Sequence, residues 1–169
     1  MRGISIYALV ILFSISIFSC QEKEDLSANQ LEGLYESREF IDSLELWTVS
    51  TYKFAPNGSY EFWITMRSSE TGSDLGYRRF LKGEYQWDGL TLSYQPENGD
   101  GLPFGSPELY RPKSQLESFD NYVFDYFRAL KAKLEFSSSK EIMVYQEIYP
   151  DTWPEVNQEE SRTFIRVSR

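Results

Sequence analysis

The segment Tyr52–Phe62, YKFAPNGSYEF, constrains the fold of this chain more than any other stretch of the sequence. Its central Asn57-Gly58 pair is a strong signal for a tight hairpin turn, in which both central residues adopt positive φ. After the turn, large apolar residues alternate with other residues at the period of a β-strand: Tyr60, Phe62, Ile64 and Met66. The segment therefore predicts an antiparallel β-hairpin with one buried face.

Similar patterns recur along the chain at short, regular spacing. A second hairpin is predicted over Gly83–Leu92, with Asp88-Gly89 as its turn, and further strands over 130–136, 142–149 and 163–167. This spacing predicts an all-β fold, an antiparallel up-and-down β-barrel of about eight strands. Its first and last strands should pair, with Tyr35 and Arg166 meeting near the closure. A β-sandwich is the alternative.

The stretch 120–130 fits two structures. Val123, Phe127 and Leu130 suit one face of a short helix, although a strand is also compatible with the pattern. The barrel is thus expected to carry at most one short helix.

Residues 95–121 break the regular strand spacing. They contain four of the seven prolines and show no sustained period, which predicts a long loop. Glu97–Gly101 lacks the ligand spacing of a calcium loop, so we interpret it as a turn. We expect the loop to cover or flank one end of the barrel, with Leu102, Phe104 and Tyr110 facing the opening. The alternative is a flexible insertion.

Residues 1–19 have the order of a secretion signal. Arg2 precedes a mainly apolar run that is too short to span a bilayer comfortably. Ile17-Phe18-Ser19-Cys20 resembles the lipobox of bacterial lipoproteins, in which the cysteine becomes the acylated first residue. The alternatives are a membrane-spanning anchor, or an ordinary cleavage site followed by a free thiol.

Cys20 is the single cysteine of the chain, which suits an anchor better than a disulfide. Residues 20–30 are mostly polar and are expected to form a tether ahead of a single domain over 31–169. We therefore expect a lipid-anchored monomer in the cell envelope, an outer-membrane lipoprotein facing the periplasm or the cell surface.

Charge and composition exclude several functions. The net charge is −9, and Arg2 is the one charged residue before Cys20, so nucleic acid is not an expected partner. The chain has no histidine, which removes Ser-His-Asp and Cys-His nucleophiles and imidazole metal ligands. No distinctive pair of carboxylates stands out. We expect no enzyme, no metal and no cofactor.

The high content of aromatic residues is the part of the composition that bears most on function. Of the 28 aromatic residues, 25 remain after residues 1–19 are removed. Aromatic side chains on alternating strand faces fill or line a barrel interior. The candidate ligand-binding residues are Tyr52, Phe54, Tyr60, Phe62, Tyr85, Trp87, Phe104 and Tyr110. If Trp47 and Trp63 instead point outward together, they would form a stacking surface for glycan or protein.

Four segments together resemble the lipocalin-like barrels of bacterial lipoproteins, a small calycin-type fold: Leu31–Tyr35, Tyr52–Tyr60, Gly83–Trp87 and Thr163–Val167. Members of that family open with Gly-x-Trp and often end with an arginine-bearing strand. Here Tyr35 stands at the tryptophan position, and Arg169 is a rival to Arg166 for the closing arginine. The resemblance implies a small apolar ligand in the barrel. The alternatives are a surface interaction module and an accessory lipoprotein with a filled barrel.

Overall fold

The computed structural model describes residues 31–150 and 161–168. Its elements in chain order are β1 (Gly33–Ile41), η2 (Asp42–Leu44), β2 (Leu46–Phe54), β3 (Ser59–Arg67), β4 (Asp74–Trp87), β5 (Thr91–Gly101), η3 (Lys113–Gln115), β6 (Glu117–Ser118), α2 (Asn121–Ala129), β7 (Lys131–Phe136), β8 (Ile142–Ile148) and β9 (Ser161–Val167). The predicted Cys20 anchor and the tether lie outside the described residues.

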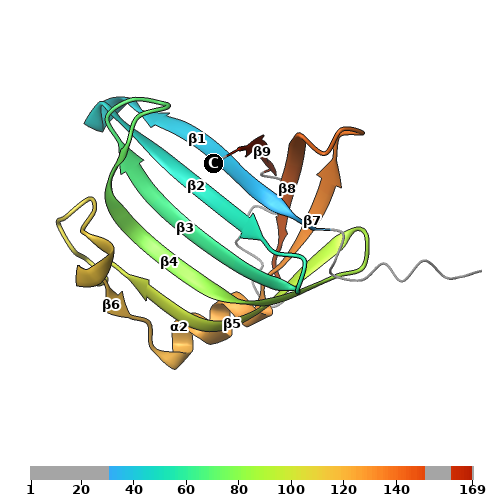
Figure 1. The fold of residues 1–169 in the computed structure, drawn as a ribbon. Helices are drawn as coiled ribbons and strands as arrows, with labels where there is room; N and C mark the ends of the chain where they lie inside the picture. The colour runs from blue at the N-terminus through green and yellow to red at the C-terminus, as the bar shows by residue number, and fades with distance from the viewer. Residues whose placement is uncertain (1–30, 151–160, 169) are drawn as a thin grey trace, which may run out of the picture.

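Eight antiparallel strands close into a barrel (Figure 1). Each strand pairs with the next one along the chain, β5 pairs with both β4 and β7, and β9 returns to pair with β1. The two-residue β6 adds to the edge of β5. The predicted up-and-down barrel is confirmed, and the sandwich alternative is wrong.

The closure joins the two ends of the described domain. Leu34, Tyr35 and Glu36 pair with Val167, Arg166 and Ile165, so Tyr35 stands opposite Arg166 as predicted. Beyond Glu36, β1 continues without β9 beside it, and β1–β4 extend together as one long sheet (Figure 1).

The predicted hairpin turns are present, but their geometry differs from the expectation. Gly58 and Gly89 have positive φ, whereas Asn57 and Asp88 do not. The side-chain oxygen of Asn57 accepts a hydrogen bond from the amide of Ser59, and that of Asp88 accepts from the amide of Thr91. Asn57 and Asp88 thus stabilise the turns through their side chains rather than through a left-handed backbone.

The predicted loop over 95–121 is wrong at both of its ends. β5 continues to Gly101, so Glu97–Gly101 is strand and not a turn. Pro96 pairs with Gly83 where the register shifts, a place at which a strand tolerates a missing amide. Phe119 lies against Gly99, where an added Cβ would come within 2.7 Å of the ring. The glycine that breaks the sequence pattern therefore makes room for an aromatic ring.

The ambiguous stretch forms the helix α2, which lies against β5. Asp120 caps it, because its carboxylate accepts a hydrogen bond from the amide of Val123 at 3.0 Å. The remaining irregular segment runs from residue 102 to residue 112.

The barrel interior contains one continuous apolar cluster. It includes residues from all eight barrel strands: Tyr35, Tyr52, Phe54, Tyr60, Phe62, Leu81, Tyr85, Leu92, Tyr94, Ala132, Leu134, Met143, Tyr145 and Phe164. At one end, here named the closed end, Phe54 packs edge-on against Tyr85 at 5.2 Å and Trp87 against Phe136 at 5.9 Å. Ring packing fills the barrel at this end.

Candidate functional site: a cavity inside the barrel

The other half of the barrel is not filled. A cavity of about 290 Å³ lies there, at the lower end of the size range of ligand pockets. Its walls come from β2, β3, β4, β5, β8, β9 and α2, and the segments next to them: Tyr52, Tyr60, Phe62, Ile64, Arg79, Leu81, Tyr94, Tyr126, Phe127, Leu130, Tyr145, Glu147, Tyr149 and Arg162. Side chains from segments far apart in the sequence therefore share one interior space.

Three tyrosines in the cavity wall are connected by hydrogen bonds between their hydroxyl groups. The hydroxyl of Tyr94 lies 3.2 Å from those of Tyr52 and Tyr145, and the Tyr52 and Tyr145 rings stack at 5.5 Å. Each hydroxyl carries one proton, so Tyr94 donates to one neighbour and accepts from the other. We name these three residues the tyrosine cluster.

Burial keeps the tyrosine cluster protonated above the pH at which tyrosine usually titrates. It raises the pKa of Tyr52 to about 12, and it raises the pKa of Tyr94 and of Tyr145 well above the usual value. The cluster therefore offers a ligand aromatic faces and hydroxyl groups, but no charge at neutral pH.

Three charged residues also line the cavity, and we name the part of the lining that they form the mouth: Arg79, Glu147 and Arg162. Tyr149 donates a hydrogen bond to the carboxylate of Glu147. Counted over the described residues, the mouth thus has two positive groups and one negative group, a net of +1 in a chain of net charge −9.

Arg79 has an unusual environment for a guanidinium. It is half-buried, and its Cζ lies 5.2 Å from the Phe127 ring and 5.9 Å from the Phe119 ring. Within residues 31–150 and 161–168 it makes no ion pair and no hydrogen bond through its side chain. Burial lowers its pKa.

The register of β4 places Arg79 toward the cavity. Arg79 pairs with Ile64, and Leu81 pairs with Phe62, so these four residues share the inner face of the sheet. On the far side of Arg79 the register shifts, because Thr65 pairs with Tyr77 and leaves Arg78 without a partner on β3. Arg78 is exposed.

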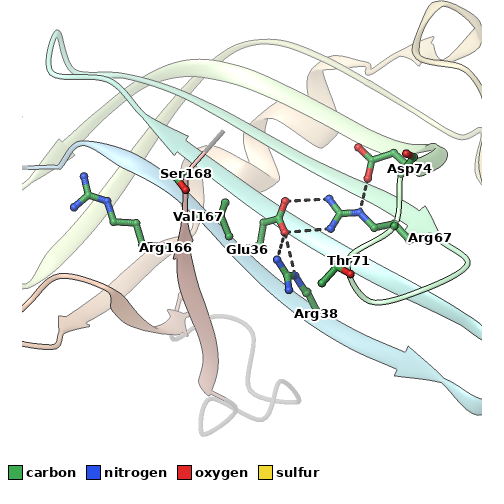
Figure 2. Close-up of a pocket in the computed structure, with 10 residues that line it drawn as sticks. Glu36, Arg38, Arg67, Thr71, Asp74, Arg166, Val167 and Ser168 are labelled. Carbon is green, nitrogen blue, oxygen red and sulfur yellow. Dashed lines mark hydrogen bonds and ion pairs between the residues drawn. The ribbon is translucent and has the colours of Figure 1, made fainter.

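Larger hollows of about 650 and 670 Å³ lie on the outside of the barrel, but both are more open to solvent than the interior cavity. Figure 2 shows the first of them, with Arg67 between Glu36 and Asp74. Arg67 donates to Glu36 at 3.0 and 3.1 Å and to Asp74 at 2.6 Å. Arg38 donates to Glu36 as well, at 2.9 Å.

The charged side chains of this network form ion pairs with one another. Glu36 and Arg67 are 3% and 4% exposed, so the pair is withdrawn from water. Burial alone would lower the pKa of Arg67, but the hydrogen bonds to Glu36 and Asp74 outweigh it, and the pKa is raised. We interpret this ion-pair network as a structural feature that connects β1, β3 and β4.

The predicted ligand-binding residues divide into three groups. Tyr52, Tyr60 and Phe62 line the cavity. Phe54, Tyr85 and Trp87 pack at the closed end, where the Tyr85 hydroxyl donates to the carbonyl of Leu31 at 3.0 Å. Phe104 and Tyr110 lie outside the barrel interior.

The 102–112 segment explains why Phe104 and Tyr110 lie apart from the cavity. Leu102 and Phe104 border a separate hollow beside Arg79, so the segment flanks the mouth, but Phe104 is fully exposed and does not face the opening. The turn at Pro103–Ser106 has Gly105 at φ +76 with open space around it. Tyr110 lies against Gly76 of β4.

Several lining residues were missed from the sequence. Tyr94 and Tyr145 could have been found by strand alternation, because Tyr94 has the parity of Leu92 and Tyr145 that of Met143, both apolar residues of the same strands. Arg79 and Arg162 gave no sequence signal, since charged residues are expected to face solvent. Tyr126 and Phe127 could be identified as lining residues only once the position of α2 was known.

The alternative stacking surface is not formed. Trp63 points away from the cavity but is 8% exposed, and Trp47 is half-buried with its ring 5.3 Å from Phe40. In the described part of the chain, no group of acidic, histidine or cysteine residues could hold a metal ion. None of the helices described there is long and apolar enough to cross a membrane.

No family model matches the chain, and no curated protein is significantly similar to it. A functional assignment therefore depends on the cavity and its lining.

Proposed function

We propose that this protein is a lipocalin-like carrier or sensor that binds one small, largely apolar molecule inside its barrel. The observation that supports this most is the contrast between the two halves of the barrel. Rings fill the closed end, whereas a cavity of about 290 Å³ with mainly aromatic and aliphatic walls remains beneath α2. A pocket with apolar walls and a few convergent polar groups is the usual form of a small-molecule site.

Binding fits this cavity better than catalysis. The chain has no histidine, and burial raises the pKa of Tyr52, Tyr94 and Tyr145 further above neutral pH, so their hydroxyls are poor proton donors. Among the described residues of the lining, Glu147 is the one carboxylate, so the part of the chain that the structure describes supplies no pair of carboxylates for acid–base work. We propose that the ligand leaves the site chemically unchanged.

We also propose that acylated Cys20 holds the protein on a membrane. The described chain begins at Leu31, whose carbonyl accepts the Tyr85 hydroxyl at the closed end. An anchor just before this point would place the closed end toward the membrane and leave the mouth open to the aqueous phase. Such an orientation suits exchange of a ligand with a soluble partner.

Native mass spectrometry of the purified residues 21–169 tests ligand binding without knowledge of the ligand. We expect an added small-molecule mass that disappears on denaturation. Ile64→Phe, which narrows the cavity, should reduce the bound fraction, whereas Ile165→Phe on the outer face should not, because Ile165 is 57% exposed. Equal occupancy in the two variants would contradict a site inside the barrel.

The anchor is tested separately in cells. Cys20→Ala should move the protein from the membrane fraction to the soluble fraction, because the thiol is the acylation site. Cys20→Ser serves as a second variant with a side chain of similar size. Unchanged membrane partition of both variants would contradict the lipid anchor.

A further inference from the structure

The half-buried guanidinium at the mouth of the cavity carries an inference about the ligand itself. This inference rests on the proposed function, since it concerns the same cavity. Arg79 has five N–H donors and no acceptor. The rings of Phe119 and Phe127 lie near it, but no carboxylate or carbonyl among the described residues accepts a hydrogen bond from it.

Partial burial of a charged group that has no hydrogen-bond partner costs desolvation free energy. In the same barrel, Arg67 has two carboxylates within hydrogen-bond distance. Arg79 has a cavity beside it instead. Because the rings of Phe127 in α2 and of Phe119 lie near the guanidinium and restrict its motion, its donors are already ordered when a ligand arrives.

We propose that the ligand is an amphiphilic monocarboxylate, whose carboxylate binds Arg79 at the mouth and whose apolar body lies against the tyrosine cluster. Charge balance favours a single negative charge. Among the lining residues that the structure describes, Arg79 and Arg162 are opposed by Glu147, and this net of +1 matches one carboxylate. A doubly charged phosphate would leave the mouth with an excess negative charge.

The cavity size limits the body of the ligand. A volume of about 290 Å³ suits a short aliphatic or single-ring acid rather than a long acyl chain. Aromatic walls favour either kind of body, while the neutral tyrosine hydroxyls can accept one further polar group on the ligand.

Isothermal titration calorimetry with octanoate and octanamide tests the proposal. The two probes share a body and differ in charge. We expect octanoate to bind the wild-type protein about tenfold or more tightly than octanamide, as for a charge-assisted hydrogen bond. Arg79→Met should abolish this preference. Arg78→Met removes the same charge from the adjacent exposed position and should retain the preference.

Arg79→Gln is a second variant, and circular dichroism of each variant establishes that it is folded. Equal binding of octanoate and octanamide to the wild type would overturn the carboxylate proposal and leave the cavity as a ligand site. A preference that persists in both Arg79 variants would overturn it as well. Binding of neither probe would overturn this ligand class, while native mass spectrometry decides separately whether the barrel holds any ligand.

Discussion

Arg67 and Arg79 lie in neighbouring strands, the first buried and the second half-buried, and the surroundings of their guanidinium groups are opposite. Arg67 lies between Glu36 and Asp74, and these hydrogen bonds raise its pKa despite burial. Arg79 lies near two phenylalanine rings with no acceptor among the described residues, and burial lowers its pKa. The first is satisfied within the fold, and the second is available to a ligand.

A charged side chain with partners inside the fold and one without them should affect stability in different ways. A buried ion pair is strongly destabilising when one partner is removed, because the other is left charged and unpaired. When a half-buried charge has no partner, its removal leaves no other charge unpaired, and it relieves the free-energy cost of desolvating that charge. The two arginines should therefore respond differently to the same substitution.

The largest effect is expected at the paired arginine. Arg67→Met should lower the free energy of unfolding by about 3–5 kcal/mol, because it leaves the buried Glu36 without its main partner. Urea denaturation followed by tryptophan fluorescence measures this. The double variant Glu36→Gln/Arg67→Met should recover part of the loss. A loss below about 1 kcal/mol would show that the network behaves as an exposed one.

The alkaline stability of the protein tests whether the cavity wall is dry. The pKa of Tyr52 is raised from 10.0 to about 12, so its neutral form is favoured in the folded state. This contribution is fully present below about pH 10 and is lost as the pH rises through about 12.

The expected size of that loss follows from the shift of about two pH units. At 1.36 kcal/mol per unit, Tyr52 contributes about 2–3 kcal/mol, which unfolding titrations at increasing pH would measure. Tyr52→Phe should flatten the dependence in this window, whereas Tyr122→Phe should not, because Tyr122 is 80% exposed. Identical pH profiles for the wild type and Tyr52→Phe would mean that water reaches the hydroxyl.

The smallest stability change is expected at the unpaired arginine. Arg79→Met should change the free energy of unfolding of the ligand-free protein by less than about 1 kcal/mol, with stabilisation the expected sign, because no partner is orphaned. The comparison with Arg67→Met under the same conditions is the measurement. A loss as large as that of Arg67→Met would show that Arg79 is structural.

The fold could be predicted from the sequence because its signals are local. Strand alternation and the Asn57-Gly58 and Asp88-Gly89 pairs depend on neighbouring residues, and the barrel followed from their number and spacing. β5 was the exception. Its continuation through Pro96 and Gly99 depends on a register shift against β4 and on the ring of Phe119, neither of which is local.

The cavity could be predicted only in part, for the same reason. Alternation placed Tyr52, Tyr60 and Phe62 inside the barrel, but it could not show which half of the barrel is filled. The closed end is filled because Phe136 of β7 meets Trp87 of β4, a long-range contact. Arg79 became a candidate ligand-binding residue only when its position in the cavity wall, next to Phe127, was known.

A crystal structure of the protein with 8-bromooctanoate would show where the proposed ligand binds, because bromine can be located by its anomalous scattering. We expect a bromine peak inside the barrel near Tyr94, with the carboxylate within hydrogen-bond distance of Arg79. A bromine peak confined to the outer hollow beside Glu36 and Arg67, or a carboxylate away from Arg79, would contradict this expectation.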